Sequence, residues 1–166
     1  LRARGETFYV KAAATSPVRL MAAHGRAILR SPATWARTLA LAIGMRSPGL
    51  KSLIWQLFYF LEAGVLADHL RRNRVRHLHN HFGNSSCSVA VLAAELAGIP
   101  FSFTEHGPAI FFEVNLWSLP EKIARAAFVV AITHFCRSQL MLFSDPAHWG
   151  KITIVHCGVD PAAYRR

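Results

Sequence analysis

The sequence predicts an α/β fold, in which a parallel sheet with flanking helices follows a helical segment. From residue 75 onward, short runs rich in β-branched and aromatic residues alternate with helical segments, whereas residues 8–74 carry helical patterns. Strands that alternate with helices pair in parallel through right-handed crossovers. At 166 residues the chain has room for one domain with a sizeable core. We therefore expect residues 1–74 to form a helical, basic segment and residues 75–166 the βαβ core of the same domain.

Serine, proline and glycine divide the first half into elements. Residues 7–10 are expected to form a short strand. Ser31 before Pro32 places a capping hydroxyl ahead of a proline suited to the first helical position, which predicts a helix over residues 32–45. A break follows, and a second helix is expected over residues 50–72. Helical spacing places Ile54, Leu57, Phe58, Leu61 and Val65 along one apolar stripe of this second helix.

Four β-rich runs and the helices between them make up the second half. Ser85 or Ser86 is expected to cap the first of these helices. Ser118 and Glu121 match a capping box, which predicts the start of the next helix, and Thr133 is expected to cap the last. The expected strands are 75–80, 100–104, 128–132 and 152–156, and the expected helices are 85–97, 119–127 and 133–143.

The excess positive charge is confined to the first half. Residues 1–76 contain 13 Lys or Arg against 3 acidic residues, whereas residues 77–166 contain 6 against 6. Such a one-sided field favours an anionic partner such as phospholipid headgroups, nucleic acid or a phosphorylated substrate, although a solvated basic face has the same composition.

The expected helix over residues 50–72 is apolar on more than one face, so it is buried on several sides or meets a membrane or partner. Its most apolar stretch, residues 53–67, contains Gln56 and Glu62 and is shorter than the ~18 residues that span a bilayer. We therefore predict no transmembrane helix.

The cysteines and the amino terminus bear on location. Cys87, Cys136 and Cys157 are odd in number and lack a CxxC pair, which fits neither a disulfide framework nor a zinc knuckle and favours a reducing, cytoplasmic setting. The chain opens on a polar segment without Met, so we expect no signal peptide and a fragment of a longer protein.

Polar, glycine and ring-bearing residues follow the predicted strands, where ligands bind in an open parallel sheet. His106 comes directly after a strand, and Gly107 lets a backbone or ligand approach closely. The imidazole is suited to donate to a phosphate or sugar hydroxyl, or it bonds a loop carbonyl. Glu105 serves as a base, holds His106 or is exposed at a loop. The segments that follow the strands are His81-Phe82-Gly83-Asn84, Glu105-His106-Gly107-Pro108, Thr133-His134 and Cys157-Gly158-Val159-Asp160.

Three alternating histidines, His77, His79 and His81, would point to one face of a strand and so raise the possibility of a zinc site. Against it, four residue steps on a strand cover about 13 Å, which separates His77 from His81 too widely for one ion. No carboxylate or thiolate is close in sequence, so we expect no metal.

Three stretches of the second half carry a specific pattern: HLHNHFGNSSCSVAVLAAELAGIPFSFTEHGPAIFF, KIARAAFVVAITHFCRSQL and KITIVHCGVDP. In this order they resemble the N-terminal domain of family-4 glycosyltransferases, particularly those of exopolysaccharide and colanic-acid assembly. The resemblance covers about residues 75–161. Residues 1–74 match loosely, as the variable helical insertion before the first of these strands.

The resemblance implies the Rossmann-like N-terminal half of a GT-B enzyme, whose two domains face each other across a cleft. Such enzymes transfer a hexose from a sugar nucleotide with retention of configuration and need no metal or other cofactor. By this likeness His106 contacts the donor sugar or phosphate, with Glu105 as the second catalytic candidate. Residues 154–160 would form the last strand before the second domain. The other implied site residues are His81, Phe82, Gly83 and Asn84 on the acceptor side, and Gly107, Thr133 and Arg137 on the donor side or in the cleft.

The resemblance also implies partners and a location. The acceptor would be a saccharide or a lipid-linked saccharide, met by a cytoplasmic protein that attaches peripherally to the anionic inner face of the plasma membrane. Nucleic acid is not expected. The family's first strand, glycine-rich turn and donor-binding second domain have no counterpart here, so we expect the isolated chain to be inactive.

Two other functions agree with parts of the sequence. A non-enzymatic basic module would bind membranes or nucleic acid through the first half, with strong dependence on salt. A metal-dependent hydrolase would use His77, His79, His81 and His106.

Overall fold

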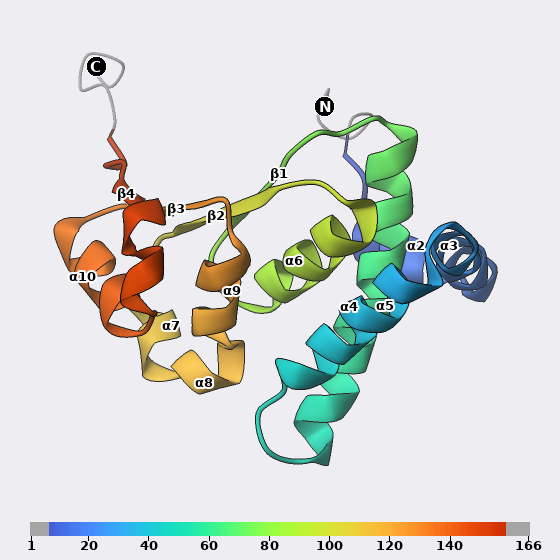
Figure 1. Ribbon diagram of the computed structural model, residues 1–166, viewed down its shortest axis with the longest axis horizontal. Coiled ribbons are helices and arrows are strands. Elements are labelled where there is room, and N and C mark those ends of the chain that lie inside the picture. The colour runs from blue at the N-terminus through green and yellow to red at the C-terminus, as the bar shows by residue number, and fades with distance from the viewer. Residues whose placement is uncertain (1–6, 159–166) are drawn as a thin grey trace, which may run out of the picture.

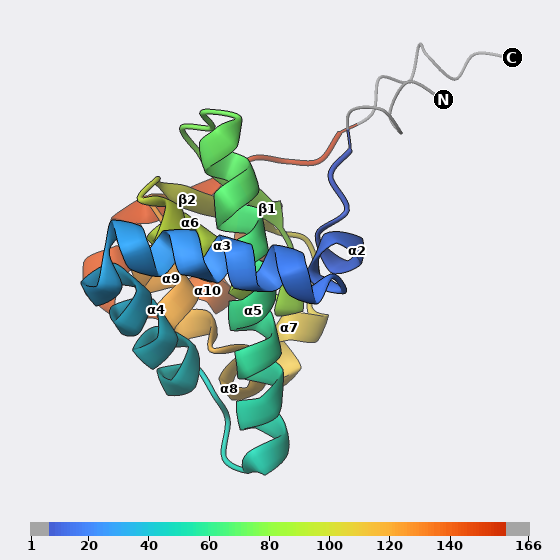
Figure 2. The ribbon, with the colours of Figure 1, turned by 90° about the vertical axis from the view of Figure 1, so that its right-hand side faces the viewer.

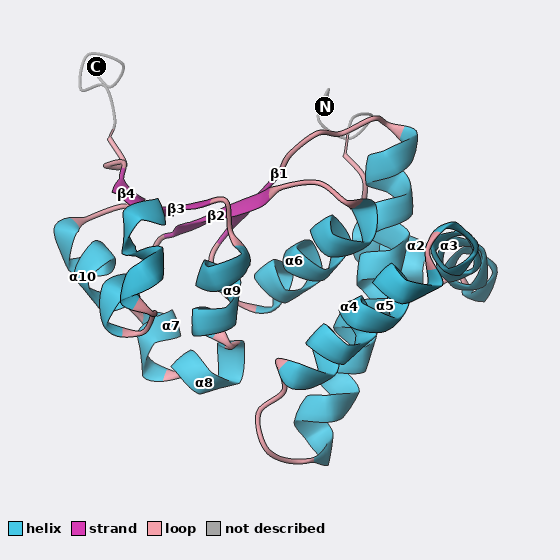
Figure 3. Cartoon of the chain, viewed as in Figure 1, coloured by secondary structure: helices cyan, strands magenta, loops and turns pink. Residues whose placement is uncertain are grey.

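The computed structural model describes residues 7–158 and shows the expected α/β architecture, a four-stranded parallel sheet flanked by helices (Figures 1 and 3). Helices precede the sheet up to Arg72, and strands alternate with helices after it. Val159 and Asp160, predicted to end the last strand region, lie outside the described residues. The elements are α2 (Val10–Ala14), α3 (Pro17–Arg30), α4 (Pro32–Gly44), α5 (Leu50–Arg72), β1 (Leu78–His81), α6 (Ser85–Ala97), β2 (Phe101–Glu105), α7 (Ala109–Phe112), α8 (Val114–Trp117), α9 (Leu119–Arg125), β3 (Phe128–Ala131), α10 (His134–Leu142), the 3₁₀ helix η1 (Pro146–Lys151) and β4 (Ile152–Ile154).

The first helices begin at serine–proline pairs. Ser31 caps α4, its hydroxyl accepting a hydrogen bond from the Thr34 backbone N–H, as predicted. Ser16 does the same for α3 with Pro17 behind it. The predicted strand over residues 7–10 is wrong, because Val10 already begins α2 and the residues before it are irregular.

Helix α5 has the predicted bounds, and of its apolar stripe only Val65 is buried. Ile54, Leu57, Phe58 and Leu61 are exposed. The buried face is rotated because small residues let α3 and α6 approach α5 closely, and the first turns of α5 project beyond α6 (Figure 1). This buried face consists of Gln56, Phe60, Ala63, Gly64, Val65, Ala67 and Leu70.

Helix α5 is also long and apolar enough to cross a membrane by length and composition. Its 23 residues reach a mean hydropathy of 1.3 over the most apolar window, and about a third (33%) of that window is buried within the described part of the chain. Core helices of soluble proteins meet the same criteria, so the absence of a transmembrane helix stays a prediction.

The sheet has the strand order β1-β2-β3-β4, with all neighbouring strands parallel. Because each strand lies next to the one before it, right-handed crossovers place α6, α9 and α10 on the same side of the sheet (Figure 3). The core lies between these helices and the sheet, and its largest strand residues include Phe101, Phe103 and Val129. Among residues 7–158 no helix covers the other face of the sheet. There the side chains of His77 and His79 stack on Phe128, and the three cover the buried Ser102 and Thr104.

Of the three helix caps predicted in the second half of the chain, two are wrong and one is confirmed. Asn84, rather than Ser85 or Ser86, caps α6, its side chain accepting from the Ser86 backbone N–H. Ser118 makes no cap hydrogen bond at the start of α9, because it adopts a left-handed conformation and its hydroxyl donates to the Met45 carbonyl instead. Thr133 caps α10 as predicted.

Candidate functional site

The segments after β1 and β2 meet at the carboxyl edge of the sheet, as the carboxyl-edge rule predicts. The Phe82 backbone N–H donates to the Thr104 carbonyl at 2.8 Å, which ties the first segment to β2. His81 Nδ1 lies 2.7 Å from His106 Nε2, a hydrogen-bond distance. The Phe82 ring lies 4.8 Å from the His106 ring and is half exposed, at 49%. Thus the two predicted groups His81–Asn84 and His106–Gly107 form one cluster.

Glu105 holds this cluster together from the interior of the protein by hydrogen bonds to both of its segments. It ends β2 and is 2% exposed. Its Oε2 accepts from the Gly83 backbone N–H at 2.7 Å, and its Oε1 accepts from the backbone N–H groups of His106 at 3.1 Å and Gly107 at 3.4 Å. Burial raises the pKa of this carboxyl, and the three N–H donors and Lys122 offset part of the rise. The geometry is that of a carboxylate joining two loops; its catalytic role stays a prediction.

Lys122 is a site residue that the sequence analysis missed. It comes from α9, is 0% exposed, and its Nζ donates to the carbonyls of Gly83 at 2.7 Å and Asn84 at 2.9 Å. Burial lowers the pKa of Lys122 to about 8, although the nearby Glu105 carboxyl opposes the change. The signal that would have found it is a lysine on the apolar face of a helix, three residues after the buried Leu119.

The turn between these two buried groups has no room for a side chain at Gly83. A Cβ there would lie 2.7 Å from Glu105 Oε2 and 3.4 Å from both Ile110 and Leu119. Phe82 just before it has a positive φ of 67°, an uncommon value for a residue with a side chain. The turn is therefore held in a strained shape by Glu105 on its N–H side and Lys122 on its carbonyl side.

The remaining predicted site residues lie differently. Thr133 uses its hydroxyl to cap α10, accepting from the Cys136 backbone N–H at 3.0 Å. Arg137 donates from Nε to the Ile152 carbonyl at 3.1 Å, so its guanidinium is anchored at β4. Cys157, after β4, brings its Sγ to 3.9 Å from His106 Nδ1. The structure thus joins His106 to β1 and to the segment after β4, while Thr133 and Arg137 support the β3–β4 side of the sheet.

The alternating histidines do point to one face; His77 and His79 have hydroxyl partners, whereas His81 pairs with His106. His77 Nε2 and His79 Nδ1 each lie 2.7 Å from Ser102 Oγ, and His79 Nε2 lies 2.9 Å from Thr104 Oγ1. Burial, followed by the neighbouring histidines, lowers the pKa of His79. Within residues 7–158 no three His, Cys, Asp or Glu side chains are grouped to hold a metal ion.

Comparison with known families adds one finding. The sequence model of the family described as Glycosyltransferase Family 4 matches residues 17–163, which includes the helical first half as well as the sheet. A comparison with curated proteins found no match.

Proposed function

Because the chain belongs to glycosyltransferase family 4, we propose that it is the acceptor-side domain of a retaining hexosyltransferase that uses a sugar nucleotide. Family membership supports the transferase activity and the need for a sugar donor and an acceptor. The observation that supports the location of the site is the hydrogen-bonded pair His81–His106 beside the exposed Phe82 ring. It lies at the edge of a parallel sheet where ligands bind.

Each residue of the cluster has a role in this proposal. His106 donates a hydrogen bond to the donor sugar or its phosphate, and His81 orients the His106 ring through their 2.7 Å contact. Phe82 offers an apolar ring to the face of an acceptor sugar, while Gly83 and Asn84 shape the turn beneath it. Glu105 and Lys122 keep the turn in place from inside the protein. Gly107 leaves the approach to His106 open, since a Cβ there would meet nothing within 4 Å.

The surroundings of the reaction are part of the proposal. The acceptor is a saccharide, in its lipid-linked form an intermediate of exopolysaccharide assembly, and the nucleotide is held by a second domain across the cleft. Transfer needs no metal or other cofactor. The protein works in the cytoplasm, attached to the inner face of the plasma membrane. The basic residues of the first half support this location, because each contributes roughly 1 kcal/mol near an anionic surface.

The test is transfer of radiolabelled hexose from a panel of sugar nucleotides to bacterial lipid extract by the protein at its native length. His106→Ala should lower the transfer rate by about 100-fold, the usual contribution of a positioned acid, base or charge-stabilising group. The unfolding midpoint should stay unchanged, because the His106 side chain is partly exposed and bonds only at the surface of the cluster.

His148→Ala is the matched control. This histidine lies in η1, which precedes β4 and so sits at the opposite edge of the sheet. Full activity of His106→Ala would remove His106 from the site. A wild-type protein that transfers no hexose from any sugar nucleotide would refute the proposed function itself.

A further inference from the structure

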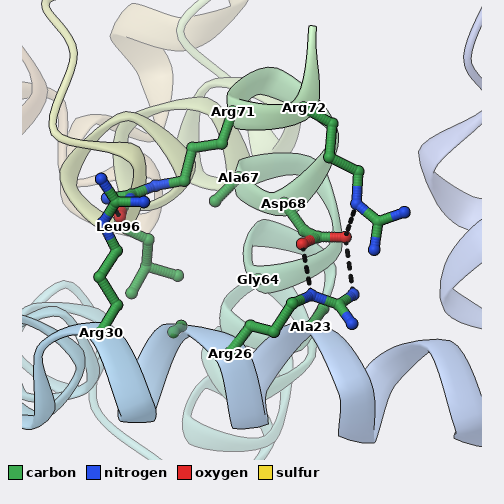
Figure 4. A pocket seen from close by; sticks show the side chains of 10 residues that line it. Ala23, Arg26, Arg30, Gly64, Ala67, Asp68, Arg71, Arg72 and Leu96 are labelled. Atoms are coloured by element: carbon green, nitrogen blue, oxygen red, sulfur yellow. Dashed lines mark hydrogen bonds and ion pairs between the residues drawn. The ribbon is translucent and has the colours of Figure 1, made fainter. Parts of the chain in front are cut away.

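A hollow of about 270 Å³ lies at the edge of the domain opposite the candidate site. It is bounded by α3, by the last turns of α5 and by the end of α6 (Figure 4). The carboxyl ends of α5 and α6 each lead into the start of a strand, so the hollow is on the side where β1 and β2 begin. Its floor is made of small residues, Ala23, Ala27, Gly64 and Ala67.

On one side of the hollow the charged side chains are paired with one another. Asp68 is the sole carboxylate among its described lining residues, and Arg26 donates to it twice, from Nε at 2.7 Å and from Nη2 at 2.8 Å. Arg72 adds an ion pair from Nε at 3.0 Å. Asp68 is therefore fully engaged by Arg26 and Arg72 on its own side of the hollow (Figure 4).

The other side carries two guanidinium groups without a carboxylate. Arg71 donates from Nη2 to the Leu96 carbonyl at 2.7 Å, but its Nη1 is buried and has no partner within the described structure. Arg30 reaches toward it from α3 and forms no ion pair with a described carboxylate (Figure 4). Burial and then the charge of Arg30 lower the pKa of Arg71. Four arginines against one carboxylate leave this hollow strongly positive.

We propose that the hollow binds a phosphate group between Arg30 and Arg71. The planar guanidinium presents several N–H donors in a fixed fork that matches the oxygens of a phosphate. A bound phosphate would accept from the exposed guanidinium of Arg30 and would screen the repulsion between the two arginines. It would also give Arg71 Nη1 its missing acceptor once the Arg71 guanidinium turns toward the hollow. The small residues of the floor leave the space that the ligand needs.

A phosphate of this kind comes either from a phospholipid headgroup or from a soluble phosphate compound. The neighbouring surface of α3 is relevant to this choice. Val18, Met21 and Leu29 are 70%, 69% and 86% exposed, and they share one face of α3 beside the face of Arg26 and Arg30. Helix α3 lies across the outside of α5, so this face is open (Figure 2). Apolar side chains next to a phosphate site match a headgroup above an acyl layer.

The experiment measures binding of this chain to two probes at constant ionic strength. The first is vesicles of phosphatidylcholine with and without phosphatidylglycerol, and the second is inorganic phosphate and pyrophosphate in solution. Arg30→Gln should weaken binding of the recognised probe about tenfold, the loss expected for one charge-assisted contact. Arg37→Gln removes the same charge from an exposed position on α4 and should change binding less than about twofold.

Arg30→Gln carries the test because Arg30 is exposed, so folding does not depend on it. Arg71→Gln should give the same loss, but it also removes the hydrogen bond to Leu96 at the end of α6. Selective binding of phosphatidylglycerol vesicles would identify the headgroup source, and binding of free phosphate the soluble source. Equal losses in Arg30→Gln and Arg37→Gln, or no binding of either probe, would overturn the proposal. The proposal does not depend on the glycosyltransferase site, which these variants leave intact.

Discussion

Replacing Lys122 by methionine tests whether a buried charge holds the turn of the candidate site. Methionine keeps most of the length of the lysine stem and removes the ammonium group. The ammonium group donates to the carbonyls of Gly83 at 2.7 Å and Asn84 at 2.9 Å, and the side chain is 0% exposed. The substitution therefore leaves the Gly83 carbonyl without its donor, whereas the Asn84 carbonyl still accepts from the Ser88 backbone N–H at 3.2 Å.

Two large and opposing effects determine how much Lys122→Met changes the free energy of unfolding at pH 7. Leaving the Gly83 carbonyl unsatisfied costs about 1–3 kcal/mol, and losing the second bond to the Asn84 carbonyl, which keeps its Ser88 donor, costs about 0.5–1.5 kcal/mol more. In the other direction, burial lowers the pKa of Lys122 from 10.5 to about 8, which means that holding the charged form inside costs about 3 kcal/mol. We expect the effects to cancel in large part, so that Lys122→Met lowers the free energy of unfolding by no more than about 2 kcal/mol at pH 7.

The difference between wild type and Lys122→Met should then grow with pH. A lysine with a lowered folded pKa releases its proton at about pH 8 in the folded protein, while the unfolded chain holds the proton until about 10.5. Between these values the unfolded state binds more protons, so the wild type becomes more stable as pH rises. By pH 10 it should gain about 2–3 kcal/mol over Lys122→Met. Burial raises the pKa values of the Cys87 and Cys136 thiols to about 12 and about 11, which destabilises both proteins above pH 9. The effect of Cys136 cancels in the comparison, whereas the charge of Lys122 acts on the pKa of Cys87, so that the two groups titrate together in the wild type.

Urea unfolding followed by tryptophan fluorescence at pH 7 and pH 10 measures this difference directly. Lys51→Met, at an exposed position on the first turn of α5, controls for the loss of a lysine and should stay within about 0.5 kcal/mol of wild type at pH 7. If the free-energy difference between wild type and Lys122→Met is the same at both pH values, Lys122 does not carry a lowered pKa and the reasoning fails.

Two further substitutions test the packing of α3 against α5 and the titration of Glu105 in the candidate site. Gly64→Ala should lower the free energy of unfolding by about 1–3 kcal/mol, because the new Cβ would lie 2.2 Å from His24 Nε2. Gly25→Ala is the control: its Cβ would have nothing within 4 Å, so it should raise the free energy of unfolding by up to about 1 kcal/mol. Thermal unfolding compares the two variants. Relative to Glu105→Gln, the wild type should lose stability as pH rises from 4.5 through the raised pKa of Glu105, and a constant difference across acid pH would contradict this.

Local sequence signals predicted helix caps correctly where the capping hydroxyl bonds a neighbouring backbone group. They failed where the hydroxyl bonds a residue that is distant in the sequence. Ser31 and Thr133 cap the helices that follow them, since only neighbouring backbone groups are involved. Ser118 has the same sequence signal, but its hydroxyl donates to Met45, 73 residues away. Nothing in the sequence around Ser118 contains that partner. The rotated buried face of α5 has a related cause, because the small residues facing α3 and α6 decided its orientation.

The candidate site was predictable where it follows from sheet topology. His81 and His106 are 25 residues apart and were expected at the same edge, and their rings meet. Lys122 was not predictable by that rule, because it comes from a helix and reaches the turn from inside the core. Sheet topology identifies the residues that face a ligand. The residues that support them from the core are set by burial and by the need to satisfy hydrogen bonds.

The contact between His81 and His106 limits the proton arrangement of the site. A hydrogen bond between His81 Nδ1 and His106 Nε2 needs a proton on one of these atoms and a lone pair on the other. When both rings are neutral and His81 donates, His106 carries its proton on Nδ1 and donates from that side. When His106 donates instead, its Nδ1 is an acceptor. Because Nδ1 is the nitrogen near the segment after β4, with Cys157 Sγ at 3.9 Å, the state of His81 determines whether His106 offers a donor or an acceptor there. A phosphate or a sugar oxygen needs the donor, so the proposed function requires His81 Nδ1 to carry the shared proton unless the His106 ring is doubly protonated.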